Sequence, residues 1–224
     1  MARALEACAV GAHFSFTFMK FILGTKQNML TVYTEDGRAH AATIVVVEPA
    51  VVTQIKTKEK DGYAAVQLGS GSTKESRVNK AQLGHTKGKA LKHFRELRLK
   101  DGAAADLEVG AAVDVSSFAT GDTVEVSAIS KGKGFQGVVK RHGFRGGQRT
   151  HGQKHSEREP GSIGGSGGRA GGRVAKGIRM AGRMGGERVT VKNLTVLQAI
   201  PETGELVLKG AIPGRRGTLV EVRG

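Results

Sequence analysis

A basic, glycine-rich span at residues 130–189 limits what this chain can fold into more than any other feature. It holds 14 Lys or Arg against three acids, so +11 of the formal net charge of +15 lies there. It also holds 18 of the 34 glycines, and its few apolar residues follow neither a helical nor a strand period. Such a segment cannot bury enough apolar surface to offset the entropy lost on ordering. We therefore predict that it becomes ordered against a partner.

The side chains of the span favour RNA as that partner. Arg and Lys bind phosphate through charge-assisted hydrogen bonds, and glycine lets the backbone approach a crowded polyanion. Each phosphate contact steepens the salt dependence of binding by roughly 0.7 to 0.9 units. The alternative is a solvated, disordered linker. Against a linker stand seven large apolar residues of the span: Phe135, Phe144, Ile163, Val174, Ile178, Met180 and Met184.

Composition narrows the function class further. A pI near 10.2 and the absence of Trp are more typical of a nucleic-acid binder than of an enzyme with 224 residues. A membrane surface is the competing partner for a basic chain, but no apolar run approaches bilayer length and the span has no amphipathic helical face. The single cysteine, Cys8, excludes an internal disulfide and a cysteine-cluster metal site, which fits a reducing compartment.

The rest of the chain is rich in strand patterns. Asp36-Gly37 predicts a tight hairpin turn between two of the strands. Residues 70–93 are polar and basic, and we predict a loop-rich arm with a helical turn near Ala90, while residues 91–99 fit a helix or a strand equally. The predicted strands cover residues 28–34, 41–48, 51–57, 63–69, 111–118, 122–130, 187–200, 206–212 and 218–222.

These patterns predict a mainly β fold, with a closed β-barrel and a smaller α+β portion. Strands on either side of a long insertion can pair directly, so the insertion would leave the rim of the barrel as an irregular arm. Residues 19–130 and 187–224 would form the barrel-based body. Residues 131–186, hereafter the finger, would be the insertion. Residues 1–18 read as an N-terminal extension or a misassigned start, because Met19 opens a second plausible start.

Catalytic and metal sites find little support. His142, His151 and His155 lie close in sequence, but Gly152 argues against the helix that a His-x3-His site needs. His85 and His93 are read as solvent or RNA contacts, since nothing completes a metal site. Glu157 and Glu159 can pair with arginines as readily as act in acid-base chemistry. The run GSIGGSGGRAGG at 161–172 lacks the ending of a phosphate-binding loop, so we predict no enzyme, metal or cofactor.

Three segments of the basic span carry a specific resemblance: KGKGFQGVVKRHGF at 131–144, THGQKHSEREPGSIG at 150–164 and GRVAKGIRMAGRMGGERVTVKNL at 172–194. Earlier segments at 21–37, 52–69 and 78–89 agree in the same order. The chain, over about residues 20–223, resembles the bacterial-type large-subunit ribosomal protein family uL3, also called L3.

The resemblance implies a translation-protein-type β-barrel bound to large-subunit (23S-type) rRNA, beside neighbouring large-subunit proteins, in the cytoplasm of a bacterium or in an organelle. It also implies that the finger penetrates folded RNA toward the peptidyl transferase centre, where the RNA performs the chemistry. The family motifs place Lys131, Lys133, Phe135, Lys140, Arg141 and Phe144 on the way into the finger, Thr150, His151, Gly152, His155, Pro160, Gly161, Ser162 and Gly164 in its middle, and Lys176, Met180, Gly182, Met184 and Gly185 on the return.

Physical chemistry supports these positions, because Lys and Arg meet phosphates while His and Phe stack on bases. Phe135 and Phe144 could equally pack at the base of the finger, and packing is favoured for Met180 and Met184. The predicted RNA contacts are completed by seven arginines of the finger: Arg145, Arg149, Arg158, Arg169, Arg173, Arg179 and Arg183.

The sequence also departs from the family pattern. A glutamine that is often methylated in the family aligns with Gly147, beside Gln148, and residues 165–171 are richer in glycine than usual. The leading hypothesis is a structural protein of the large ribosomal subunit that aids its assembly. The rivals are a free RNA-binding or RNA-chaperone protein and an enzyme with a phosphate-binding glycine loop.

Overall fold

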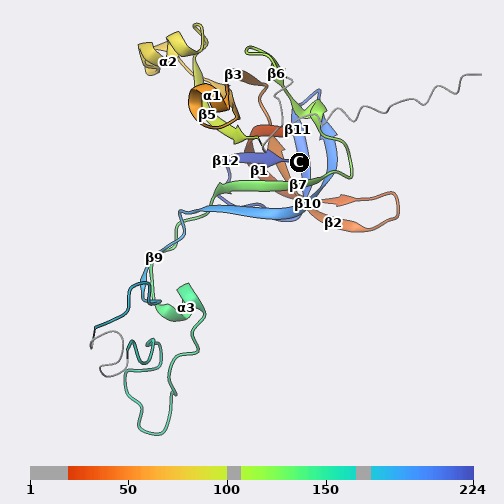
Figure 1. The fold of residues 1–224 in the computed structure, drawn as a ribbon. Coiled ribbons are helices and arrows are strands. Elements are labelled where there is room, and N and C mark those ends of the chain that lie inside the picture. Colours follow the sequence, from red (N-terminus) through yellow and green to blue (C-terminus); the bar gives the residue numbers. More distant parts are fainter. Residues whose placement is uncertain (1–19, 100–106, 165–172) are drawn as a thin grey trace, which may run out of the picture. The chain divides into compact units, whose positions relative to one another are not determined.

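The computed structural model describes residues 20–99, 107–164 and 173–224. The chain forms two compact units, one around residues 50–113 and the other around residues 22–49 and 114–224 (Figure 1). Both units are built on β-sheet, with short helices between strands. The mainly β fold class predicted from the sequence is confirmed.

A closed six-stranded barrel forms the body of the second unit, with strand order β1-β12-β7-β10-β11-β2. The barrel that we predicted is therefore present. Its strands are β1 (Phe21–Tyr33), β2 (Ala39–Val46), β7 (Thr123–Ile129), β10 (Arg188–Ile200), β11 (Glu205–Lys209) and β12 (Leu219–Arg223).

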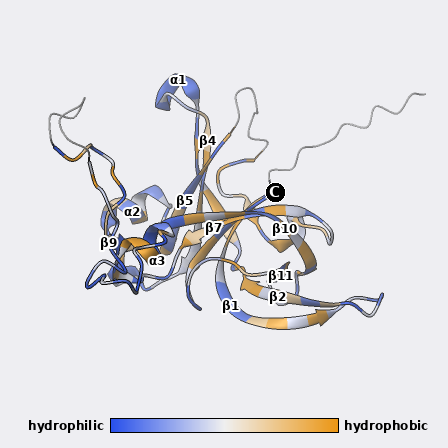
Figure 2. Ribbon diagram, turned by 90° about the horizontal axis from the view of Figure 1, so that it is seen from below, coloured by the Kyte–Doolittle hydropathy of each residue, from blue (hydrophilic) through white to orange (hydrophobic). Residues whose placement is uncertain are grey.

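The barrel core follows from the two-residue period of its strands. Alternate residues of a strand point to the same side, so a regular apolar alternation fills a small barrel with side chains. Figure 2 shows the hydrophobic residues spread along these strands. Fully buried members of the core come from all six strands: Ile22, Leu23, Val45, Val124, Val126, Val196, Leu206, Leu208, Val220 and Val222.

The first strand of the barrel begins earlier than the sequence indicated. We expected it from residue 28, but β1 starts at Phe21, and Phe21, Ile22 and Leu23 are all buried. Consecutive buried residues have no alternation, so the strand pattern was hidden there. Gly24 continues the burial, because a Cβ at this position would lie 2.5 Å from Val45 Cγ1.

Residues 111–118 form much less strand than predicted. Only β6 (Ala112–Val113) is strand, and a 3-10 turn, η2 (Val115–Ser117), follows it. The Asp114 carboxylate accepts a hydrogen bond from the Ser116 backbone N–H at 3.0 Å and so offers the backbone an alternative to a strand ladder. Val115 is nevertheless buried, which explains the misleading apolar pattern.

The first unit is a four-stranded sheet in the order β5-β4-β3-β6. The ambiguity at 91–99 resolves to a strand, paired along β4. The helical turn predicted near Ala90 is wrong, because the helix lies earlier and a strand begins at Leu91. Besides β6, this unit contains β3 (Ala50–Lys56), α1 (Lys58–Asp61), β4 (Ala65–Ser72), η1 (Glu75–Arg77), α2 (Lys80–His85) and β5 (Leu91–Arg98).

A polar network joins three strands or turns of this sheet. Lys56 Nζ lies 2.7 Å from Glu96 Oε1 and donates to the Tyr63 hydroxyl at 2.8 Å. The Tyr63 hydroxyl donates in turn to Glu96 Oε2 at 2.8 Å. The hydrogen bond from Lys56, followed by that from Tyr63, lowers the pKa of Glu96 against the opposing effect of its partial burial. The network therefore favours an ionised Glu96.

Candidate nucleic-acid interface

Backbone pairing at the base of the finger continues the barrel. Beyond the pair Arg188↔Ile129, the Ser130 N–H donates to the Glu187 carbonyl at 2.8 Å and the Lys133 N–H to the Met184 carbonyl at 2.9 Å. The strands β8 (Gly134–Gln136) and β9 (Gly182–Met184) then pair. The prediction of an irregular insertion is thus wrong for its base. These elements are three residues long, too short to produce a period.

A glycine permits this close approach. Gly185 has φ of +74°, in the left-handed region, and a Cβ on it would lie 2.2 Å from the Lys131 carbonyl oxygen. Only glycine adopts such a conformation at little cost and also leaves that space empty. Gly185 therefore lets the segment that carries Lys131 and Lys133 lie against the returning segment, where Arg183 is paired with Phe135.

The short helix α3 (Val138–His142) anchors the outgoing strand to the returning one. Val138 is 2% exposed, and Gly143 ends the helix in the left-handed conformation. Arg141 Nη1 donates to the Met180 carbonyl at 2.8 Å, and His142 Nε2 lies 3.0 Å from the same oxygen. Arg141 was predicted to contact RNA, but here it binds the protein backbone, so part of its role is to hold the finger together.

The middle of the finger folds back on itself through two glycines. The Gly147 N–H donates to the carbonyls of Ser156 and Glu157, both at 3.2 Å. A Cβ on Gly146 would lie 2.0 Å from the Glu157 carbonyl oxygen. The resulting loop borders an open hollow of about 480 Å³, lined by Phe144, Arg145, Gly146, Gly147, Gln148, Gln153, Ser156, Glu159, Pro160 and Gly161. A hollow of this size and polarity can receive a nucleobase.

An ion pair crosses the same loop. Arg149 Nε donates to Glu157 Oε1 at 3.0 Å, and Arg149 Nη2 lies 2.5 Å from that oxygen. The hydrogen bond from Arg149 lowers the pKa of Glu157 and raises the pKa of Arg149 itself. Both side chains remain well exposed, so the pair orients the loop more than it stabilises it.

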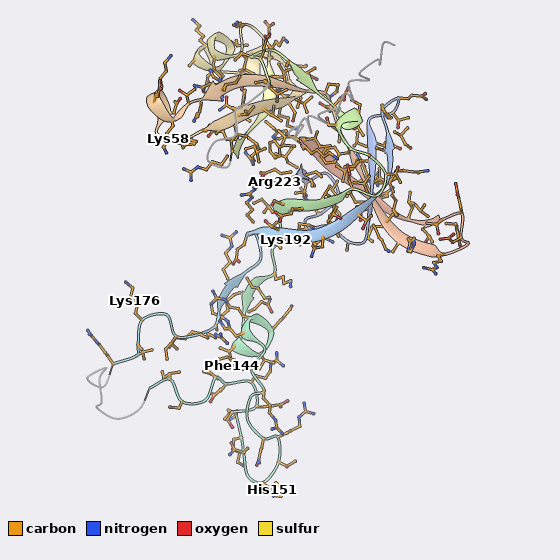
Figure 3. All side chains as sticks on the ribbon, turned by 45° about the vertical axis from the view of Figure 1, so that its right-hand side comes forward. Lys58, Phe144, His151, Lys176, Lys192 and Arg223 are labelled. Atoms are coloured by element: carbon orange, nitrogen blue, oxygen red, sulfur yellow. The ribbon has the colours of Figure 1, made fainter. Side chains whose placement is uncertain are left out.

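Most of the predicted RNA contacts point to solvent. Figure 3 shows His151 at the end of a loop and Lys176 on a separate segment. His151 has φ of +60°, so this loop end is a tight turn. The exposed members are Lys131, Lys133, Phe135, Lys140, Arg145, Arg149, Thr150, His151, Gly152, His155, Arg158, Ser162, Arg173, Lys176, Arg179 and Arg183, whereas Arg141 and Phe144 are half-buried.

The aromatic and methionine residues separate into two groups. Phe135 is 76% exposed, so it does not pack at the base of the finger. Phe144 is half-buried, and its ring centroid lies 6.0 Å from that of His142. Met184 is half-buried as expected, but Met180 is 37% exposed, contrary to the packing that we predicted. Phe135 is therefore the more exposed of the two phenylalanines of the finger.

Some sequence predictions fall outside the described residues. These are the contact of Arg169, the glycine-rich stretch at 165–171 and the extension at 1–18; most of the glycine-loop alternative at 161–172 lies there too. In the described ranges, no group of three or more His, Cys, Asp or Glu could hold a metal ion. No helix in those same ranges is long and apolar enough to cross a membrane.

The structure adds a basic cluster that sequence reasoning missed. Lys26 Nζ donates to the carbonyls of Ile212 and Gly214, at 2.6 and 3.0 Å. Its burial, and secondly the charge of Lys131, lower the pKa of Lys26. Arg216 Nε donates to Gln27 Oε1 at 3.4 Å. Lys26 thus lies close enough to Lys131 for the two charges to interact, and the RR pair at 215–216 places a further arginine on the barrel.

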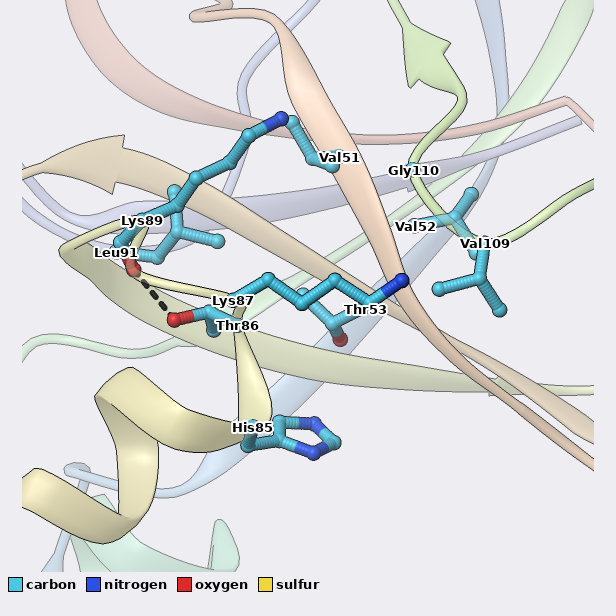
Figure 4. Close-up of a pocket in the computed structure, with 10 residues that line it drawn as sticks. All are labelled: Val51, Val52, Thr53, His85, Thr86, Lys87, Lys89, Leu91, Val109 and Gly110. Carbon is cyan, nitrogen blue, oxygen red and sulfur yellow. Dashed lines mark hydrogen bonds between the residues drawn. The ribbon is translucent and has the colours of Figure 1, made fainter.

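A second pocket, in the first unit, is drawn in Figure 4. Its volume of about 70 Å³ holds a few waters and is well below the size of a nucleotide site. The lining residues are Val51, Val52, Thr53, His85, Thr86, Lys87, Lys89, Leu91, Val109 and Gly110.

These features define the class of the protein. It is a closed β-barrel with a basic, glycine-rich arm whose side chains are mostly exposed. Comparison with known proteins identifies the family. The chain belongs to the ribosomal protein L3 family. The family model described as Ribosomal protein L3 matches residues 97–204.

Curated relatives match almost the whole chain. The large ribosomal subunit protein uL3 of Acidothermus cellulolyticus is 48% identical over 206 residues, which cover 92% of each chain. The protein of the same name from Chlorobium phaeobacteroides is 46% identical over 206 residues, 91% of this chain and 98% of the relative. That of Herpetosiphon aurantiacus is 48% identical over 203 residues, 90% and 94% of the two chains.

Proposed function

We propose that this chain is a structural constituent of the large ribosomal subunit. It binds large-subunit rRNA, aids assembly of the subunit and supports the region near the peptidyl transferase centre. The observation that carries the proposal is the finger, whose base is fixed by backbone bonds while its cations and Phe135 face outward. Membership of the ribosomal protein L3 family and the names of the relatives support it. The proposed location of the protein is the ribosome, in the cytoplasm of a bacterium or in an organelle.

The proposed role is non-enzymatic. Exposed Lys and Arg neutralise phosphates and release counterions, and glycines admit the backbone between RNA strands. In such a site the protein supplies positive charge and shape, and the RNA retains the chemistry. Neighbouring large-subunit proteins are the remaining proposed partners.

Sedimentation tests this function directly. Tagged full-length protein should co-sediment with large subunits in gradients of low magnesium concentration. A free RNA-chaperone would remain in the light fractions, and that result would exclude the ribosomal role. Nucleotide binding or turnover by the purified protein would instead support an enzyme.

A deletion tests the division of labour between body and finger. Without residues 131–186, the barrel should still unfold cooperatively, because the pairs Arg188↔Ile129 and Val191↔Val126 and the buried core of the barrel lie outside the deletion. Assembly of large subunits should fail. Calorimetry of the purified variant and gradient profiles of cells that depend on it measure the two effects. Loss of cooperative melting would contradict the separate roles.

A further inference from the structure

The distal part of the β1–β2 hairpin carries an exposed apolar face with no role in the proposed rRNA contact. In its register Thr31 lies opposite Ala41 and Tyr33 opposite Ala39. Opposed residues of an antiparallel pair share a face, and every second residue of a strand returns to it. This surface, hereafter the hairpin face, consists of Met29, Thr31, Tyr33, Ala39 and Ala41.

All five side chains of the hairpin face are exposed. Met29 is 51% exposed and Tyr33 73%, which makes Tyr33 second only to Phe135 among the exposed large apolar residues that the structure describes. The opposite side of the hairpin is less exposed, since Leu30 is 38% exposed and Val32 and His40 are half-buried. The hairpin face is therefore an apolar surface on a two-stranded ribbon, a form that is marginally stable in water without a covering partner.

The charges around the hairpin face differ in sign from those of the finger. Residues 27–37 contain no Lys or Arg, and the turn presents Glu35 and Asp36 against Arg38 alone. Figure 2 shows the hydrophobic stretch along β1 and the hydrophilic turn at its end. The two carboxylates beside this uncharged face repel phosphates and attract Lys and Arg.

We propose that the hairpin face docks a segment of a neighbouring basic protein in the assembled subunit. The segment presents apolar side chains to Met29 and Tyr33 and places Lys or Arg beside Glu35 and Asp36. Apolar contacts at the centre with ionic contacts at the rim are the usual anatomy of a protein interface. This inference rests on the proposed function, because it takes the partner to be another protein of the large subunit.

Site-specific photocrosslinking tests the inference. Full-length protein carrying Tyr33→p-benzoylphenylalanine replaces the cell's own copy, and purified large subunits are irradiated. We expect one subunit protein in the adduct, joined through a peptide that contains Lys or Arg next to apolar residues. The same probe at Phe135, equally exposed on the finger, should form an adduct with rRNA.

The outcomes separate the two proposals. A Tyr33 adduct with rRNA, with a second copy of this chain or with nothing would overturn the docking inference, while a Phe135 adduct with rRNA would leave the proposed function intact. Absence of the chain from subunits and of any Phe135 adduct would overturn the proposed function, and the inference with it.

A matched charge reversal supplies the second readout. Glu35→Lys should lower retention of the captured protein in salt-washed subunits about threefold, as expected for loss and reversal of one rim contact. Glu59→Lys, an exposed carboxylate of α1 in the other unit, should leave retention unchanged. Equal retention in the two variants would count against the assigned role of the acidic turn.

Discussion

The base of the finger should fail when Gly185 is replaced by alanine. The new Cβ would lie 2.2 Å from the Lys131 carbonyl oxygen, and since Cβ contacts below 3.0 Å essentially do not occur, the strands must separate by at least 0.8 Å. The hydrogen bond from Lys133 to Met184, 2.9 Å long, lies next to this contact. Its loss costs about 1 kcal/mol, and the left-handed φ of +74° costs alanine about 1–2 kcal/mol more.

Amide hydrogen exchange of the purified protein measures this loss. An opening free energy reduced by about 2 kcal/mol speeds exchange of the Lys133 N–H by about 30-fold. Gly132→Ala is the matched control, because Gly132 faces the same contact without positive φ and its Cβ would meet nothing within 4 Å. The control should change exchange of that amide by less than about threefold. Equal exchange in the two variants would refute the close-approach argument.

Two further predictions concern charge. Replacing Lys131, Lys133 and Arg183 together by glutamine should reduce the slope of log affinity against log salt by about 2, because three exposed cations no longer release counterions. Filter binding to a large-subunit rRNA fragment measures this slope. An unchanged slope would show that the finger base does not contact the RNA. Glu96→Gln should destabilise the protein by about 0.5–1 kcal/mol at neutral pH in urea unfolding, since the pair with Lys56 is partly exposed. The pKa of Glu96 is lowered in the folded state. The stabilisation from its pair with Lys56 is therefore present above the unfolded pKa and is lost as the pH falls through the folded pKa. If the free energy of unfolding of variant and parent still differed in acid, this explanation would be wrong.

The sequence predicted the barrel well where burial alternates. Val124 and Val126, and likewise Val220 and Val222, are buried at a two-residue spacing, which is the pattern that an amphipathic strand leaves in the sequence. The start of β1 was missed because Phe21 begins a run of consecutive buried residues. Such runs mark strands covered on both sides and have no period.

The candidate interface was predictable in composition but not in geometry. The cations of the finger and the exposure of Phe135 follow from a segment too poor in apolar residues to form a core. The internal role of Arg141 does not, because it depends on the Met180 carbonyl, 39 residues away along the chain. Lys26 joins the cluster through a carbonyl 186 residues away, a contact that no local pattern contains.

The order of strands in the barrel has a consequence for synthesis of the chain. β12 lies between β1 and β7, although it leaves the translating ribosome after every other barrel strand. The seam of the nascent barrel thus stays open until residues 219–223 emerge, by which time the whole cationic arm is already outside the exit tunnel. Nucleic acid that binds the arm during this interval binds a chain whose barrel is not yet closed. A chaperone that covers the arm of the nascent chain would act in the same interval.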